Sequence, residues 1–251
     1  MVKTILQLLM IFPITLALPF ESLATGVRVY LIAGQSNAAG MAHSYYLTDA
    51  EAAIPENVEL WVNVSGVAGD HRMLSSHRDL PKFGPEVKLI KLLANHYPTE
   101  RIVVIKVAKN GTNMANWVWG GSMHTLFFDT ISTILQGESP RFQALFWMQG
   151  EADCKSDERA DTYEARVISF FVDVRALDYN MTICMGLVNP PTSDYPEVYK
   201  VVNAQLRVGN SDPYTRLVTT QGLTKLMDGL HYDKQGQLEL GWRMYQTAMG
   251  N

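Results

Sequence analysis

The segment Val27-Arg28-Val29-Tyr30-Leu31-Ile32-Ala33-Gly34-Gln35-Ser36-Asn37 joins an almost wholly apolar run to a loop that contains a serine. An apolar, β-rich run that stops at a glycine predicts a strand buried on both faces. A serine at the turn after such a strand exposes its hydroxyl, and a helix that begins there aims backbone N–H groups toward it. Ser36 is equally well explained as the cap of that helix, so the segment alone leaves its role open.

Strand-like and helix-like runs alternate along the rest of the chain. Further strands are predicted at Ile102–Ala108, Gln143–Met148, Met181–Val188 and Arg216–Thr220, with a shorter β-like run at Val58–Val62. The helical runs are Glu86–His96, Thr125–Leu135, Arg159–Leu177, Val198–Val208 and Gly236–Met249. Apolar strands separated by helices predict a parallel sheet covered on both faces. We therefore expect a single α/β domain, a three-layer α/β/α sandwich around a five-stranded parallel sheet of flavodoxin-like type.

In such sheets, functional groups gather in the loops beyond the carboxyl ends of the strands. The last of these loops contains Asp228-Gly229-Leu230-His231. A serine hydroxyl needs a base to take its proton, and the base needs a third group to orient it. Asp228 can hold the imidazole of His231 from behind while the other ring nitrogen faces a serine. The competing interpretation is an ordinary surface aspartate and histidine.

Two further loops offer hydrogen-bond donors for an oxyanion. Gly111 follows one buried strand and can present its backbone N–H at close approach, and Gln149 follows the next and carries a side-chain amide. Such donors are usually the largest single contribution to acyl-transfer catalysis. The serine loop is not the G-x-S-x-G elbow of lipase-like α/β-hydrolases, because Ala38 stands in place of the last glycine.

Four segments occur in the order that is found in SGNH hydrolases: Gly34-Gln35-Ser36-Asn37, the glycine loop at Gly111, Gln149-Gly150-Glu151-Ala152-Asp153, and Asp228-Gly229-Leu230-His231. The chain resembles that superfamily from Val27 to its final helix. More narrowly, it resembles the group of sialate O-acetylesterases and acetylxylan esterases.

The resemblance implies a role for each of these positions. Ser36 is expected to be the nucleophile, His231 the general base and then the general acid, and Asp228 the residue that orients the imidazole. The backbone N–H groups of Ser36 and Gly111 and the amide of Gln149 are expected to form the oxyanion hole. The supporting residues are Gln35, Asn37 and Glu151, the last of which either braces the loops or offers His231 a second carboxylate. The chain departs from the wider superfamily at Gln149, where asparagine is usual, and at Asn110, which takes the place of a first glycine.

Composition narrows the choice of ligands. The formal net charge is -4, and no basic patch with interleaved aromatic residues is present, so a nucleic-acid partner is not expected. The histidines outside the last loop lack metal-ligand spacing, and no phosphate- or dinucleotide-binding glycine pattern occurs, so we expect neither a metal nor a cofactor. The two cysteines, Cys154 and Cys184, are expected to be free thiols rather than a disulfide, although export would permit a bridge. Trp117, Trp119 and Tyr195 are candidates for stacking on a sugar ring, and core packing or a plain surface role explains each of them at least as well.

The N-terminus is typical of a secretory signal. Lys3 precedes the apolar run Ile5–Leu18, and Ser22-Leu23-Ala24 offers small residues at the positions that signal peptidase requires. We expect a signal peptide over residues 1–24, an esterase domain over residues 25–251, and a secreted or periplasmic mature protein without membrane contact. An uncleaved anchor or a plain N-terminal helix is the alternative.

The sequence as a whole favours a serine esterase that removes O-acetyl groups from carbohydrate, such as acetylxylan or O-acetylated sialic acid, through an acyl-enzyme on Ser36. A lipid- or thioester-directed SGNH hydrolase is the alternative among enzymes. A non-catalytic carbohydrate-binding module is the alternative from another class. The oligomeric state is not predicted.

Overall fold

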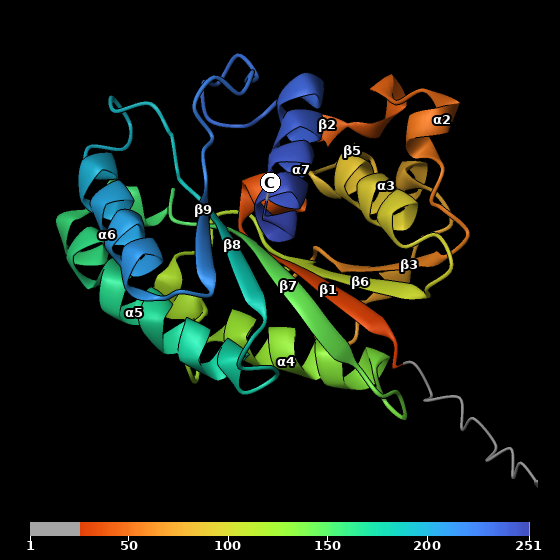
Figure 1. The fold of residues 1–251 in the computed structure, drawn as a ribbon. Helices are drawn as coiled ribbons and strands as arrows, with labels where there is room; N and C mark the ends of the chain where they lie inside the picture. The colour runs from red at the N-terminus through yellow and green to blue at the C-terminus, as the bar shows by residue number, and fades with distance from the viewer. Residues whose placement is uncertain (1–25, 251) are drawn as a thin grey trace, which may run out of the picture.

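The computed structural model describes residues 26–250, which fold around one central sheet (Figure 1). The sheet has seven strands in the order β4-β3-β6-β1-β7-β8-β9. The strands are β1 (Arg28–Gly34), β3 (Val58–Asn63), β4 (Arg72–Met73), β6 (Ile102–Ala108), β7 (Arg141–Met148), β8 (Thr182–Gly186) and β9 (Thr215–Val218). All of them run parallel except β4, which is antiparallel to β3 at the edge.

The predicted fold class is confirmed, and the predicted number of five strands is too small. The shorter β-like run becomes β3, a full member of the sheet that pairs along its whole length with β6. Its half-buried residues, Glu59 and Trp61, alternate with buried ones because the strand lies toward the edge, and Glu59 and Asn63 weaken the apolar signal. The other addition, β4, has two exposed residues, and so short an edge strand leaves no periodic pattern.

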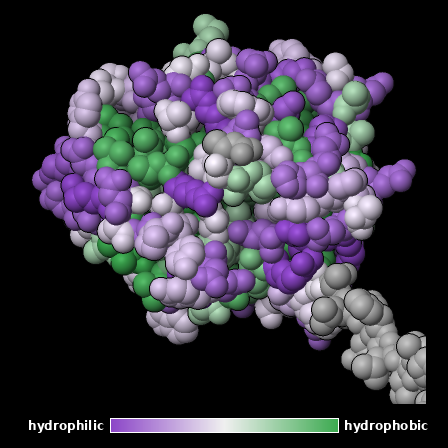
Figure 2. Space-filling view, in the orientation of Figure 1, coloured by the Kyte–Doolittle hydropathy of each residue, from purple (hydrophilic) through white to green (hydrophobic). Residues whose placement is uncertain are grey.

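Helices cover both faces of the sheet (Figure 1). On one face, α3 (Glu86–His96) packs against α7 (Lys234–Met249), and on the other lie α4 (Ser122–Ile134), α5 (Asp157–Arg175) and α6 (Val198–Ser211). The short elements are α1 (Ser36–Ala39), α2 (Asp49–Ala52), the two-stranded pair β2 (Ala42–His43) and β5 (Lys82–Phe83), and the 3-10 turns η1 (Ser44–Tyr46), η2 (His77–Asp79), η3 (Met114–Asn116) and η4 (Asp153–Lys155). The surface in the same orientation is mainly hydrophilic, with hydrophobic areas separated from one another (Figure 2).

The strand order determines where the loops meet. When β3 and the edge strand β4 are left aside, β6 lies on one side of β1 and β7, the next strand along the chain, lies on the other. Such a reversal of strand order creates a crevice in open α/β sheets. Gly34 pairs with Ala108 of β6 and with Met148 of β7, so three strands end at the same level. The loops that follow them therefore begin side by side.

The expected signal peptide lies outside the described residues. Within residues 26–250, no helix is long and apolar enough to cross a membrane.

Candidate active site

Three side chains meet at the carboxyl edge of the sheet in one hydrogen-bonded row. The Ser36 hydroxyl lies 3.0 Å from Nε2 of His231, and Nδ1 of the same ring lies 2.7 Å from Oδ2 of Asp228. Ser36 and His231 are 195 residues apart in the sequence. The arrangement has the order hydroxyl, imidazole, carboxylate that activates a serine for attack on an acyl carbon.

The loop that carries Asp228 and His231 is held closed by its own backbone. The N–H of Leu226 donates to the carbonyl of His231, and Gly229, with a φ of 66°, supplies the left-handed residue that the turn needs. The second carboxylate oxygen of Asp228 accepts the N–H groups of Leu230 and His231, both at 2.9 Å. Burial raises the pKa of Asp228, but the hydrogen bonds from the His231 and Leu230 backbone and from the His231 ring outweigh it. The net pKa lies below the ordinary range, so Asp228 stays an anion beside the imidazole.

The serine turn lies against the end of β7. A side chain at Gly34, which has a φ of 139°, would put its Cβ 1.9 Å from the carbonyl oxygen of Met148, so only glycine fits there. The next residue, Gln35, accepts the N–H groups of Gly150 and Ala152 on its side-chain oxygen, at 3.4 and 3.1 Å. These contacts fix the start of α1, where Ser36 is the first residue.

Asn37 joins the serine turn to both neighbouring loops. Its side-chain oxygen accepts the N–H of Tyr232 at 3.2 Å, and its nitrogen donates to Glu151 Oε1 at 2.7 Å and to the Leu230 carbonyl at 3.3 Å. Glu151 is buried, and burial raises the pKa of its carboxyl. Its hydrogen bond to Asn37 fits the bracing alternative, whereas the imidazole of His231 takes its carboxylate partner from Asp228.

The structure places Gly111 and Gln149, which were both expected to donate to the oxyanion, in different surroundings. Gly111, with a φ of 72°, lines the same cavity as Ser36 and His231. Gln149 does not line the cavity, because both hydrogens of its amide donate elsewhere, to the Thr112 carbonyl at 3.2 Å and to Asp153 Oδ2 at 2.6 Å. In this structure Gln149 therefore holds the loop after Gly111 instead of facing an oxyanion, which corrects the expectation for its amide.

The cavity beside Ser36 has a volume of about 360 Å³. It is lined by Gln35, Ser36, Met41, Asn110, Gly111, Ala152, Lys155, Arg159, Tyr195, Leu230 and His231. Of the three aromatic candidates, Tyr195 lines this cavity, whereas Trp117 is buried in the core and Trp119 is exposed outside the cavity. Lys155 and Arg159 were missed. Lys155 ends the turn η4 and Arg159 lies in the first turn of α5, and no sequence pattern distinguishes them from solvated surface charges.

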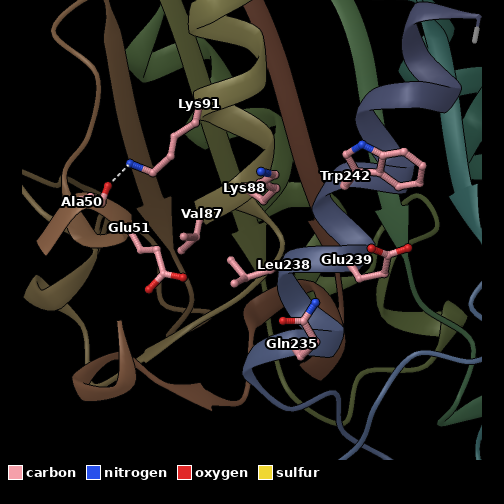
Figure 3. A pocket seen from close by; sticks show the side chains of 9 residues that line it. All are labelled: Ala50, Glu51, Val87, Lys88, Lys91, Gln235, Leu238, Glu239 and Trp242. Carbon is pink, nitrogen blue, oxygen red and sulfur yellow. Dashed lines mark hydrogen bonds between the residues drawn. The ribbon is translucent and has the colours of Figure 1, made fainter. Parts of the chain in front are cut away.

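A larger cavity of about 660 Å³ lies between α3 and α7 and beside α2 (Figure 3). Val87 and Leu238 lie at its centre, and the Lys91 ammonium at one side donates to the Ala50 carbonyl. Its lining includes neither a serine nor a histidine, so it offers no nucleophile with a base.

Within residues 26–250, no group of three or more histidine, cysteine, aspartate or glutamate residues is arranged to hold a metal ion. Cys154 and Cys184 are free and buried, which confirms the expectation of two thiols. Burial raises the pKa of the Cys184 thiol to about 12.

Comparisons with known proteins place the chain in a family. Residues 26–250 match the family described as carbohydrate esterase, sialic acid-specific acetylesterase. No curated protein matches the chain significantly.

Solved structures share the fold at low sequence identity. A protein from Arabidopsis thaliana superposes with a TM-score of 0.77 at 19% identity, over 90% of this chain and 99% of that one. NanS gives 0.70 at 13%, over 90% and 97% of the two chains. XAC1771, a carbohydrate acetylesterase from Xanthomonas citri, gives 0.68 at 16%, over 89% of this chain and 57% of that one.

Proposed function

We propose that this chain, which belongs to the carbohydrate esterase family of sialic acid-specific acetylesterases, removes O-acetyl groups from carbohydrate through an acyl-enzyme on Ser36. The observation that carries the proposal is the continuous hydrogen-bonded row from Ser36 through His231 to Asp228 at the wall of a cavity. No metal or cofactor enters the mechanism.

In the first half of the reaction, the Ser36 oxygen attacks the ester carbonyl carbon while Nε2 of His231 takes the hydroxyl proton. His231 then gives this proton to the sugar oxygen as the carbon–oxygen bond of the ester breaks. The anion of Asp228 stabilises the imidazolium that exists between these two proton transfers. The sugar leaves with its hydroxyl restored, and the acetyl group stays on Ser36.

In the second half, water attacks the acyl carbon and His231 takes a proton from it. Return of that proton to the Ser36 oxygen releases acetate and restores the enzyme. In both halves the carbonyl oxygen becomes an oxyanion, for which we assign the backbone N–H groups of Ser36 and Gly111 as donors. One such donor contributes about 3–4 kcal/mol to the transition state. The role of Gln149 is then to position the Gly111 loop through the Thr112 carbonyl.

The test is hydrolysis of p-nitrophenyl acetate by the Ser36→Ala variant. We expect kcat to fall by a factor of about 10⁴ or more, because the hydroxyl is the attacking atom. Ser211→Ala is the matched control, since Ser211 lies on the exposed side of α6 and bonds only within its helix. Thermal unfolding of both variants checks that the fold is intact. Full activity in Ser36→Ala would reject the mechanism.

We also propose that the protein is exported and that residues 1–24 are removed. The basic residue, the apolar run and the small residues around Ala24 support this. The N-terminal sequence of the protein recovered outside the cytoplasm tests it, and a mature chain that still begins at Met1 would contradict it.

A further inference from the structure

The cavity between α3 and α7 is bordered by one face of each helix (Figure 3). On α7 the lining residues recur at helical spacing from Gln235 to Trp242, a rise of about 10 Å along the helix axis. We call this cavity the α3–α7 groove. Its lining consists of Ala50, Glu51, Val87, Lys88, Lys91, Gln235, Leu238, Glu239 and Trp242.

Three hydrogen-bonding groups of the groove are not used by the protein. Within the described part of the chain, the Lys88 ammonium, the Gln235 amide and the Trp242 indole N–H form neither a hydrogen bond nor an ion pair. Gln235 is exposed, and 41% of Trp242 is exposed. Glu239 shows the contrast, because it accepts a hydrogen bond from Arg243 at 3.0 Å. The three unused groups can therefore bond to a ligand without breaking a contact of the fold.

The charges in the lining of the groove balance. Lys88 and Lys91 contribute two positive charges, and Glu51 and Glu239 contribute two negative ones. An anionic ligand would meet the carboxylates and a cationic ligand the ammonium groups in the same narrow space, and like charges at close range oppose binding. Both carboxylates are half-buried and retain oxygen lone pairs for further donors. The lining therefore fits a neutral ligand that offers hydrogen-bond donors.

The chemistry of the lining excludes a purely apolar ligand as its best occupant. Such a ligand would remove water from the Lys88 ammonium and the Gln235 amide without replacing its hydrogen bonds, which costs free energy. An indole presents an electron-rich apolar face and a polar N–H at its edge. A pyranose ring matches this pair, because one face consists of C–H groups and hydroxyls surround it. Val87 and Leu238, at the centre of the groove, add further apolar contact (Figure 3).

We infer that the α3–α7 groove is a second, non-catalytic binding site for a neutral glycan chain. Trp242 stacks on one sugar ring, and Gln235 and Lys88 bond to hydroxyl groups. The groove has a volume of about 660 Å³, against about 360 Å³ beside Ser36, so it has room for more than one ring. Its first residue on α7, Gln235, is only four residues after His231 in the sequence. Binding here needs no reaction at Ser36, so the inference does not rest on the proposed function.

The test is calorimetric titration of the full chain with neutral hexasaccharides that contain no ester. Xylohexaose, cellohexaose and mannohexaose are the probes, and we expect at least one of them to bind with a stoichiometry of one. An oligogalacturonate of the same length is the charged comparison, and we expect it to bind more weakly than the best neutral probe. Failure of all three neutral probes to bind, or tighter binding of the oligogalacturonate, would overturn the inference.

Two variants test the residues of the groove. Trp242→Ala is expected to raise the Kd of the best probe at least about tenfold, because the stacked ring is lost. Gln235→Ala removes one neutral hydrogen-bonding group from an exposed position and is expected to raise the Kd about threefold to tenfold. Trp119→Ala is the matched control, because Trp119 is 82% exposed and lies outside the groove. Its Kd should equal that of the wild type, and thermal unfolding checks that each variant is folded.

Hydrolysis of p-nitrophenyl acetate separates the groove from the cavity beside Ser36. Trp242→Ala should hydrolyse this ester at the rate of the wild type, and the hexasaccharide should not compete with it, because Trp242 does not line that cavity. A Kd unchanged in both Trp242→Ala and Gln235→Ala, or competition between the hexasaccharide and the ester, would place the bound sugar elsewhere and overturn the inference. Failure of the wild type to hydrolyse any acetyl ester would instead reject the proposed function, and the titrations would still decide whether the groove binds a glycan.

Discussion

A buried ion pair lies below the serine turn. Lys106, in the middle of β6, is fully buried, and its ammonium donates to Glu86 Oε2 at 2.7 Å and to the Ala39 carbonyl at 2.6 Å. The other oxygen of Glu86 accepts the N–H of Gly84 at 2.8 Å. The pair therefore links the sheet to the first turn of α3 and to the last residue of α1, the helix that begins at Ser36.

Removing one partner of this pair is expected to be costly. In Lys106→Met the shape of the side chain is nearly kept, but a buried carboxylate loses its cation and the Ala39 carbonyl loses its donor. Breaking a buried pair from one side typically costs about 3–5 kcal/mol in the free energy of unfolding. Glu86→Gln is expected to cost a similar amount, since the ammonium of Lys106 then lacks an anion.

The double variant Lys106→Met, Glu86→Gln shows whether the stability losses of the two single variants depend on each other. It contains no unpaired buried charge, so we expect it to be at least about 2 kcal/mol more stable than the sum of the two single losses predicts. Urea unfolding of the wild type and the three variants at one pH gives the four free energies. Losses that add to within about 0.5 kcal/mol would refute the reasoning, because independent sites add to that precision.

Two further predictions concern groups outside the hydrogen-bonded row of Ser36, His231 and Asp228. Burial raises the pKa of Asp153 to about 6 from an ordinary 3.8. Between about pH 4 and 6, the carboxyl is therefore protonated in the folded protein and ionised in the unfolded chain. The stability contributed by this group is present at low pH and is lost as the pH rises through that range. Asp153→Asn should flatten the dependence of the urea midpoint on pH, and an unchanged slope would contradict the assignment. Because Cys154 and Cys184 are free and buried, a thiol reagent should label neither in the native protein and both in denaturant; rapid labelling before unfolding would be inconsistent with the structure.

The fold was predictable because the central strands of the sheet consist almost entirely of apolar residues. Strands β1 and β6 are buried at every residue, and their predicted ends lie within one residue of those in the structure. The lateral strands were harder, since β3 alternates buried and half-buried residues and β4 consists of two exposed ones. Periodicity reports burial, and burial decreases toward the edge of a sheet.

The candidate site was predictable to the extent that it follows from topology. Parallel strands bring their carboxyl ends together, so the loops at Ser36 and His231 were expected to meet although 195 residues separate them. The direction in which a side-chain amide points does not follow from topology. Gln149 has Asp153 four residues later, and this local acceptor takes a hydrogen that the expectation had assigned to the oxyanion. Lys155 and Arg159 were missed because a cation that lines a cavity looks the same in sequence as one on the open surface.

The positions of Ser36, His231 and Asp228 depend on amide side chains that connect the loops at this edge of the sheet. Gln35 binds two N–H groups of the loop after β7, Asn37 binds Glu151 and the loop of His231, and Gln149 binds the loop of Gly111. The contacts of Gln35 and the contact between Asn37 and Glu151 join the ends of the neighbouring strands β1 and β7. Gln149 reaches past the end of β1 to the loop after β6, and Asn37 also reaches the loop after β9. A register shift of one residue would turn every side chain of the shifted strand to the opposite face and separate these partners. The register of β6, β1 and β7 therefore sets where the loops of Gly111, Ser36 and Gln149 begin, and Asn37 links the serine turn to the loop of His231.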